Sequence, residues 1–200
     1  MSDIKVVFLG DTGVGKTCII KQFTEHNFNQ NITTSLSAQF ISKTIDFEVF
    51  NKSIKFEIWD TAGHERFRSL AKIFYKDAKV VIFVYDVTDA KSFESIKNYW
   101  YEAVKNNKYN TNQILAVVAN KIDLFAKQIV NNKDGKEFAD KIGAIFQTIS
   151  CHEDSGVNAL FDIIGKIYID PYYFDIKKEE IKKQYLNKKL QELTQKKTKI

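Results

Sequence analysis

The sequence from Gly10 to Thr17 most constrains what this chain can fold into. It reads Gly-Asp-Thr-Gly-Val-Gly-Lys-Thr, the G-x-x-x-x-G-K-T pattern of a phosphate-binding loop. The β-branched and apolar residues at 4–9 predict a buried strand before the loop, and the apolar spacing of residues 18–23 predicts a helix after it. Strand, loop and helix in this order favour a phosphate site over a glycine-rich turn that binds nothing.

The residues of this loop match the chemistry of phosphate binding. Gly13 and Gly15 can adopt backbone angles closed to other residues, so that successive N–H groups can turn toward phosphate oxygens. The positive end of the following helix adds to this field. We expect Lys16 to reach the outer phosphates and the hydroxyl of Thr17 to ligate Mg²⁺.

Strands and helices alternate along the rest of the chain. Further strands are predicted over residues 38–50, 53–59, 80–85, 114–119 and 145–149. Helices are predicted over residues 65–75, 132–141 and 157–169, and from a cap at Asp89 or Ser92 to about Asn106. A hairpin at Asn51-Lys52 should place an antiparallel strand at the edge, beside central parallel strands made of continuous apolar runs. The pattern predicts an α/β fold, a six-stranded, mostly parallel sheet with helices on both faces.

The positive charge of the chain is concentrated near its C-terminal end. Residues 177–199 carry nine lysines and three glutamates, or +6, whereas the whole chain carries +5, so the rest is close to −1. This distribution argues against a nucleic-acid-binding core.

The two cysteines, Cys18 and Cys151, have no metal-ligand spacing and suit a reducing cytosol. No apolar run in the sequence approaches the length of a transmembrane helix.

Pro171, the only proline, marks the predicted boundary between a domain over residues 1–170 and a basic tail over residues 171–200. Five apolar residues of this tail fall at helical spacing among the lysines: Ile181, Tyr185, Leu186, Leu190 and Leu193. The tail is therefore expected to be either an amphipathic helix or a solvated, partly disordered extension.

Two further motifs follow predicted strands. Asp60-Thr61-Ala62-Gly63 places Asp60 where it can hold Mg²⁺ through water, and the N–H of Gly63 where it can approach a terminal phosphate. Asn120-Lys121-Ile122-Asp123 reads N-K-x-D. The carboxylate of Asp123 can accept hydrogen bonds from the ring N–H and the amine of guanine, which adenine does not offer in that arrangement. Both motifs are expected at the same end of the sheet as the phosphate loop.

The neighbours of Asp123 suit the same base. Asn120 can bond the base or tie two loops together, and the aliphatic stem of Lys121 can lie over the base plane. Ser150 and Cys151 end the last predicted strand, where a backbone N–H can meet the guanine carbonyl. The motifs are individually common, but their order along the chain indicates a guanine-nucleotide site.

Residues 4 to about 169 resemble a Ras-superfamily small GTPase, and Trp59, Glu65-Arg66-Phe67 and Tyr85-Asp86-Val87-Thr88 resemble its Rab subfamily. The resemblance implies a P-loop NTPase G domain that binds GTP or GDP with Mg²⁺ and hydrolyses GTP to GDP and phosphate. It implies a monomeric switch in vesicle trafficking. Its partners would be an exchange factor, a GTPase-activating protein and effectors that read residues 29–40 and 60–75, with no nucleic acid.

The resemblance also implies roles for individual residues. The phosphates would be cradled by Gly13, Val14, Gly15, Lys16, Thr17 and Cys18. The metal would be held by Thr17, Ser35 and, through water, Asp60. The base would be bound by Phe28, Asn120, Lys121, Asp123, Ser150 and Cys151, and catalysis would involve Lys16, Gly63 and His64. An aromatic trio that Rab effectors commonly read matches Phe40, Trp59 and Phe74, unless these are core aromatics.

Several positions depart from the family pattern. Ser35-Leu36-Ser37 stands where Thr-x-Gly is usual, and Thr34 is the alternative metal ligand if the loop shifts by one residue. Cys151-His152 replaces Ala-Lys beside the base. His64 replaces the usual Gln after Asp-Thr-Ala-Gly, which predicts slow intrinsic hydrolysis.

The C-terminal residues also differ from the family pattern. Rab chains end with one or two prenylated cysteines, whereas no cysteine follows Cys151 in this sequence. The lysine-rich tail alone predicts at most weak electrostatic contact with an acidic membrane. We therefore expect a cytoplasmic protein, or one peripheral to endomembranes.

Two other functions share some of these motifs. A GTP-binding interaction module that hardly hydrolyses GTP would carry the same loops, and would differ in the phosphate released per bound GTP. An ATP-using P-loop enzyme is disfavoured by the N-K-x-D motif and by the lack of an ATPase-type insert.

Overall fold

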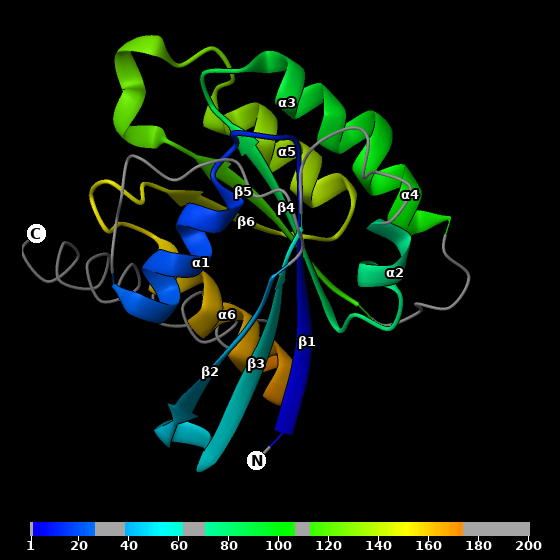
Figure 1. The fold of residues 1–200 in the computed structure, drawn as a ribbon, viewed down its shortest axis with the longest axis vertical. Coiled ribbons are helices and arrows are strands. Elements are labelled where there is room, and N and C mark those ends of the chain that lie inside the picture. Colours follow the sequence, from blue (N-terminus) through cyan, green and yellow to red (C-terminus); the bar gives the residue numbers. More distant parts are fainter. Residues whose placement is uncertain (1, 27–38, 62–70, 107–112, 174–200) are drawn as a thin grey trace, which may run out of the picture. The chain divides into compact units, whose positions relative to one another are not determined.

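The computed structural model describes residues 2–26, 39–61, 71–106 and 113–173 (Figure 1). The chain divides into two units, Met1–Ile164 and Gly165–Ile200. The first unit contains the sheet and the helices that cover it. Of the second unit, the structure describes the end of the last helix and a turn in which Tyr173 N donates to Asp170 O at 3.1 Å.

Six strands form one sheet in the order β2-β3-β1-β4-β5-β6. Their bounds are β1 (Ser2–Leu9), β2 (Gln39–Phe47), β3 (Lys52–Asp60), β4 (Val80–Asp86), β5 (Ile114–Asn120) and β6 (Ile145–Ile149). The β2–β3 pair is antiparallel, and every other neighbouring pair is parallel. The predicted α/β fold with a six-stranded, mostly parallel sheet is confirmed, including the antiparallel strand at the edge.

Helices connect the strands, and a last helix follows β6. Their bounds are α1 (Lys16–Glu25), α2 (Ala71–Tyr75), α3 (Ala90–Ser95), α4 (Tyr101–Lys105), α5 (Asn132–Lys141) and α6 (Val157–Ile169). A π-helical turn, Ile96–Trp100, joins α3 to α4, so the helix predicted to end near Asn106 is one continuous run with a wider turn inside it. Its N-cap is Asp89, whose side chain accepts a hydrogen bond from Lys91 N at 2.9 Å. Ser92 lies within the helix instead.

The hairpin between β2 and β3 differs from the prediction in one respect. The strand predicted over residues 38–50 ends at Phe47, and Glu48–Phe50 form a 3₁₀ turn. Asn51 closes this turn in the left-handed region, with φ 49°, and its N–H donates to Glu48 O at 3.0 Å. Asn is one of the few residues that adopts this conformation readily, so the chain reverses at Asn51 as predicted, while the strand before the turn ends three residues earlier than predicted.

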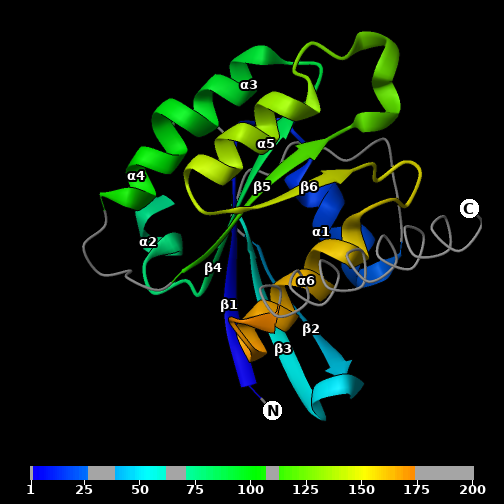
Figure 2. The ribbon, with the colours of Figure 1, turned by 180° about the vertical axis from the view of Figure 1, so that it is seen from behind.

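Helices cover both faces of the sheet (Figures 1 and 2). On one face, Phe83 and Tyr85 of β4 pack with Phe93 of α3 and with the wholly buried Trp100. On the other face, Phe161 of α6 stacks on Phe23 of α1 with ring centroids 3.5 Å apart. The helices and the central strands therefore form a rigid base for the loops at the strand ends. No helix of the described residues is long and apolar enough to cross a membrane.

Five strands run in parallel, so their carboxyl ends meet at one edge of the sheet. The last residues of these strands are Leu9, Asp60, Asp86, Asn120 and Ile149. The phosphate loop and the motifs that begin at Asp60 and Asn120 each start at one of these ends. Ligands of open α/β sheets bind at this edge, so the candidate site is expected here.

Candidate functional site

The phosphate loop connects β1 to the first turn of α1. Gly15 is the N-cap of α1 with φ 99° and ψ 20°, and Gly13 has φ 80°. Both values lie in the region that favours glycine, as the sequence predicted. Because α1 begins at Lys16, the positive end of the helix faces the loop.

Lys16 is buried beneath the loop. Its ammonium donates to Gly10 O at 2.9 Å and to Asp11 O at 3.0 Å, and the residue is 5% exposed. Burial lowers the pKa of Lys16 to about 8, although the nearby carboxylates of Asp60 and Asp11 act to raise it. The loop therefore holds a cation whose charge a phosphate group would stabilise.

Two of the predicted metal ligands lie together. Thr17 Oγ1 donates to Asp60 Oδ2 at 2.6 Å, joining the first turn of α1 to the end of β3. Asp60 is 1% exposed, and the next residue is fixed by a hydrogen bond from Thr61 Oγ1 to Phe8 O at 2.6 Å. Hydroxyl and carboxylate oxygens are the donors that Mg²⁺ prefers, so this pair fits that ion.

Asn120 links the N-K-x-D motif to the phosphate loop. Its Nδ2 donates to Val14 O at 2.8 Å, and the side chain is almost wholly buried. The sequence left open whether this amide bonds the base or ties loops together, and the structure shows the second contact. The amide oxygen of Asn120 is buried and has no hydrogen-bond partner among the described residues, so an acceptor remains at the site.

The carboxylate of Asp123 is positioned by the loop after β6. Ser150 Oγ donates to Asp123 Oδ1 at 2.7 Å, and Ser150 Oγ itself accepts from Glu153 N at 3.1 Å. Ser150 is fully buried, and its neighbour Cys151 is 5% exposed. Burial raises the pKa of the Cys151 thiol to about 12, so the thiol is neutral at physiological pH. The hydrogen bond from Ser150 orients the carboxylate of Asp123, which is expected to read the base.

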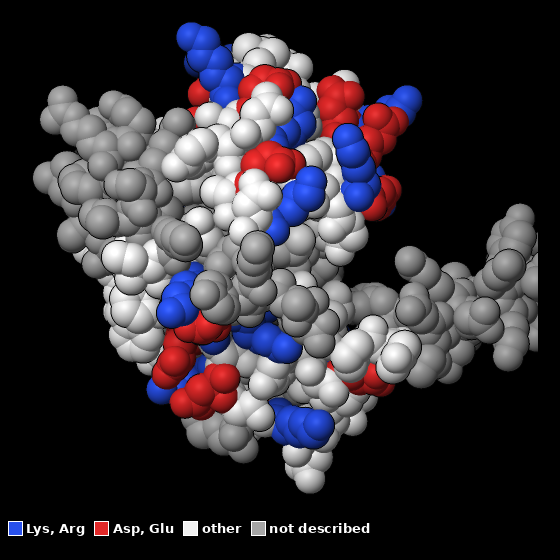
Figure 3. All heavy atoms as spheres, turned by 90° about the vertical axis from the view of Figure 1, so that its right-hand side faces the viewer, with Lys and Arg blue, Asp and Glu red and all other residues white. Residues whose placement is uncertain are grey.

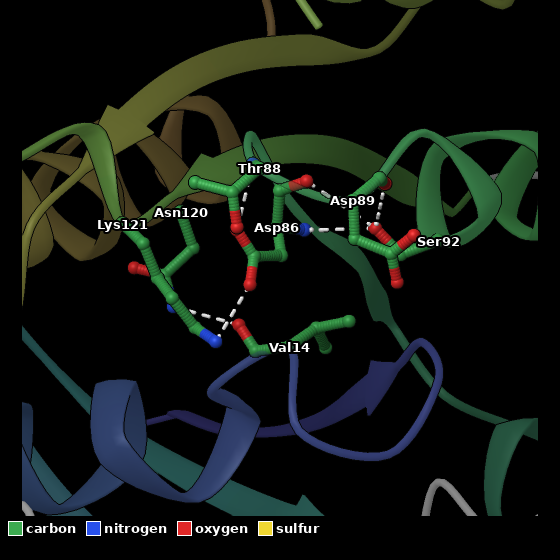
Figure 4. Close-up of polar contacts among 7 residues, drawn as sticks. All are labelled: Val14, Asp86, Thr88, Asp89, Ser92, Asn120 and Lys121. Atoms are coloured by element: carbon green, nitrogen blue, oxygen red, sulfur yellow. Dashed lines mark hydrogen bonds and ion pairs between the residues drawn. The ribbon is translucent and has the colours of Figure 1, made fainter. Parts of the chain in front are cut away.

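Lys121 is placed by a residue that the sequence analysis did not assign to the site. Its ammonium lies 2.6 Å from Asp86 Oδ2, at the end of β4 (Figure 4). In the sequence, Asp86 belongs to Tyr85-Asp86-Val87-Thr88, which resembles the Rab subfamily, and no site role was predicted for it. A carboxylate at the end of a central parallel strand was the signal that could have identified it.

The structure also describes two other residues that were predicted to cradle phosphates. Val14 is buried, and Cys18, in the first turn of α1, is half-buried, with its thiol pKa raised by burial. Four predicted site residues lie outside the described residues: Phe28, Ser35, Gly63 and His64. Of the two ranges expected to contact partners, the structure describes residues 39–40, 60–61 and 71–75. The roles of the four residues stay predictions.

The predicted aromatic trio is contiguous. The ring centroids of Phe40 and Trp59 are 5.2 Å apart, and those of Trp59 and Phe74 are 5.7 Å apart. Phe40 is 51% exposed, while Trp59 and Phe74 are half-buried. The three rings therefore reach the surface together and are not enclosed in the core.

The contact between the phosphate loop and Asn120 leads to a first prediction. A Cβ on Gly15 would lie 2.2 Å from Asn120 Nδ2, whereas a Cβ on Gly13 would have no neighbour within 4 Å. Both glycines have positive φ, so both substitutions to alanine carry backbone strain. Gly15→Ala also displaces the Asn120 amide from Val14 O, and we expect it to lower the free energy of unfolding by about 1–3 kcal/mol more than Gly13→Ala. Denaturant unfolding of the two variants measures this difference, and equal losses would contradict the prediction.

Comparisons with known proteins show the family of this chain. The family model described as the Ras family matches residues 5–169. The Ras-related protein Rab-22A of Homo sapiens is 40% identical over 166 residues, which cover 83% of this chain and 84% of that protein. The Ras-related protein RabC of Dictyostelium discoideum is 39% identical over 161 residues, covering 80% and 81% of the two chains. The Ras-related protein SEC4 of Saccharomyces cerevisiae is 36% identical over 166 residues, covering 83% and 75%. The chain therefore belongs to the Ras family, as a small GTPase of the Rab type.

Proposed function

We propose that this protein is a guanine-nucleotide switch that binds GTP or GDP with Mg²⁺ and slowly hydrolyses GTP to GDP and phosphate. The observation that carries the proposal is the hydrogen bond from Asn120 Nδ2 to Val14 O at 2.8 Å. It joins the loop expected to bind phosphates to the loop expected to bind the base. The link keeps the two loops together, so one nucleotide would contact both.

Each part of the site has a task in this proposal. The backbone N–H groups of the phosphate loop and the ammonium of Lys16 would neutralise the phosphates. Thr17 and Ser35, with Asp60 through water, would hold Mg²⁺, which would supply positive charge beside the phosphates. Asp123, held by Ser150 Oγ at 2.7 Å, would accept the two N–H groups that distinguish guanine from adenine.

The partners would read the regions that respond to the γ-phosphate. We propose that Ser35 and Gly63 are ordered by this phosphate and released after hydrolysis, so that residues 29–40 and 60–75 report the nucleotide state to an exchange factor, an activating protein and effectors. The half-exposed trio of Phe40, Trp59 and Phe74 would serve as an apolar docking surface for effectors. A role in vesicle trafficking is proposed from the Rab-type relatives.

We propose partners other than nucleic acid, because the described residues on the face in Figure 3 do not form a uniformly basic surface. On the face drawn in Figure 3, basic and acidic side chains are interspersed. Lys97 pairs with Glu94, Lys105 with Glu102 and Lys136 with Asp140 along the helices. The lysine-rich tail over residues 177–199 would add electrostatic contact with an acidic membrane.

Single-turnover hydrolysis tests the proposal. The protein is loaded with GTP labelled at the γ-phosphate, excess nucleotide is removed, and phosphate release is followed at saturating Mg²⁺. A switch should release about one phosphate per bound GTP, at a slow rate. Bound GTP that stays intact would instead support the interaction module that hardly hydrolyses GTP, and failure to load GTP would contradict the whole proposal.

The state of Lys16 predicts how nucleotide binding depends on pH. The pKa of Lys16 is about 8 in the structure, and phosphates beside its ammonium would raise it. Binding must then take up a proton wherever Lys16 is neutral in the free protein, so the affinity falls as pH rises through 8. Between pH 6.5 and 8.5 we expect the affinity for GDP to fall by about fourfold.

Equilibrium titration with a fluorescent GDP analogue measures this dependence. The upper limit of pH 8.5 keeps guanine itself protonated, and the Cys151 thiol, with a pKa of about 12, stays neutral throughout. Lys16→Arg is the matched control, because a guanidinium remains charged over this range. A flat profile for the wild type, or the same slope in Lys16→Arg, would contradict the assignment.

A further inference from the structure

The ammonium at the end of the Lys121 side chain is held by Asp86, for which the sequence predicted no role in the site. In the parallel register Asp86 lies opposite Asn120, and Val87 N donates to Asn120 O at 3.1 Å. Across this junction Lys121 Nζ lies 2.6 Å from Asp86 Oδ2, with the two side chains 33% and 11% exposed. The ion pair is largely shielded from solvent, where such a contact is stronger than at an open surface.

The Asp86 carboxylate is itself fixed. Its other oxygen, Oδ1, accepts from Thr88 N at 2.8 Å and from Thr88 Oγ1 at 2.7 Å. Its backbone N–H donates to Ser92 Oγ at 3.0 Å, and the Ser92 hydroxyl donates to Asp89 O at 2.7 Å at the start of α3 (Figure 4). These contacts come from the end of β4 and the first turn of α3, so they hold the carboxylate where Lys121 meets it.

Lys121 is also constrained at its backbone. Its φ of 66° and ψ of 37° lie in the left-handed region, which is disfavoured for a lysine. The preceding residue, Asn120, is anchored to Val14 O. The aliphatic stem of Lys121 therefore runs between a fixed backbone and a fixed carboxylate. A stem restrained at both ends has already lost rotamer freedom that it would otherwise lose on binding a ligand.

We propose that Asp86 is a positioning residue for guanine-nucleotide binding, because it holds the stem of Lys121 ready to cover the base. The inference rests on the proposed guanine site. Asp86 acts through Lys121 and reads no part of the base, whereas Asp123 selects the base. Neutralising Asp86 should therefore speed the release of nucleotide while the preference for guanine over adenine stays unchanged.

A double-mutant cycle on nucleotide release tests this role. The dissociation rate of methylanthraniloyl-GDP is measured by chasing with unlabelled GDP at fixed Mg²⁺. Asp86→Asn should release the nucleotide about tenfold faster than the wild type. In a Lys121→Met background, which keeps an apolar stem without the ammonium, the same substitution should change the rate by less than about twofold. No acceleration in the wild-type background, or the full acceleration in both backgrounds, would overturn the proposal.

A charge-matched control separates the ion pair from the general loss of a negative charge. Asp89→Asn removes the same charge three residues away, and its amide oxygen can still cap α3, so it should leave the release rate unchanged. An acceleration equal to that of Asp86→Asn would overturn the proposal.

A milder variant covers the case in which Asp86→Asn does not fold. Thr88→Val removes only the hydroxyl that donates to Asp86 Oδ1, and it should release nucleotide at a rate between those of the wild type and Asp86→Asn. A wild-type rate in Thr88→Val would count against the proposal. If the wild type retains no guanine nucleotide, the guanine site itself fails. If the wild type binds and Asp86→Asn releases at the same rate, only the role of Asp86 fails.

Discussion

Asp123→Asn should move the base preference of this protein from guanine to xanthine nucleotides. The wild-type carboxylate would accept two N–H groups from guanine, and adenine would leave it unpaired in a partly buried position. We expect the wild type to bind GDP about 10⁴-fold more tightly than ADP. An asparagine presents one acceptor and one donor, which suits the carbonyl that xanthine carries in place of the guanine amine. Competition of GDP, ADP and XDP against a labelled nucleotide measures both preferences.

The contact with Ser150 makes this a sharp test of recognition. Ser150 Oγ donates to Asp123 Oδ1 at 2.7 Å, and an asparagine can still offer an oxygen to that hydroxyl. The loop therefore keeps its anchor while the group that reads the base changes. Asp140→Asn is a suitable control, since this exposed carboxylate on α5 pairs with Lys136 and should leave all affinities unchanged. Comparable wild-type affinities for GDP and ADP, or an Asp123→Asn variant that still prefers GDP, would contradict the guanine assignment.

The fold was predictable from the sequence because the local apolar patterns agree with the burial of each element in the folded domain. Residues 80–85 and 114–119 are continuous apolar runs, and they form the central strands β4 and β5, buried on both faces. The hairpin expected at Asn51-Lys52 predicted an antiparallel strand at the edge, and β2 lies there, antiparallel to β3. The π-helical turn Ile96–Trp100 was not predictable, because it continues the same apolar spacing as the helices on either side.

The candidate site was predictable to the level of motifs. Parallel strands end at one edge, so residues after different strands were expected to meet there. The partner of each side chain was not predictable, since these contacts join residues far apart in the chain. Asn120 reaches Val14, Ser150 reaches Asp123 and Lys121 reaches Asp86. Which side chains come into contact depends on the distances between neighbouring strand ends in the folded sheet.

His64→Gln should raise the single-turnover rate of GTP hydrolysis, on the order of 10²-fold. A glutamine at this position would accept a hydrogen bond from the attacking water and donate another through its amide. A neutral imidazole also has one acceptor and one donor, but they lie on opposite edges of a rigid ring, and a protonated imidazole cannot accept at all. Either form should position water poorly. The measurement is phosphate release from preloaded GTP at saturating Mg²⁺.

The same substitution elsewhere provides the control for this experiment. His26→Gln changes an exposed histidine at the C-cap of α1, away from the strand ends, and should hydrolyse GTP at the wild-type rate. Nucleotide dissociation measured in parallel must be slower than hydrolysis, so that the rate reports the chemical step. Since catalysis in this class depends mainly on positioning, a residue that aligns water should alter the rate and leave GTP affinity nearly unchanged. Equal rates for the wild type and His64→Gln would show that His64 does not limit hydrolysis and is a tolerated substitution.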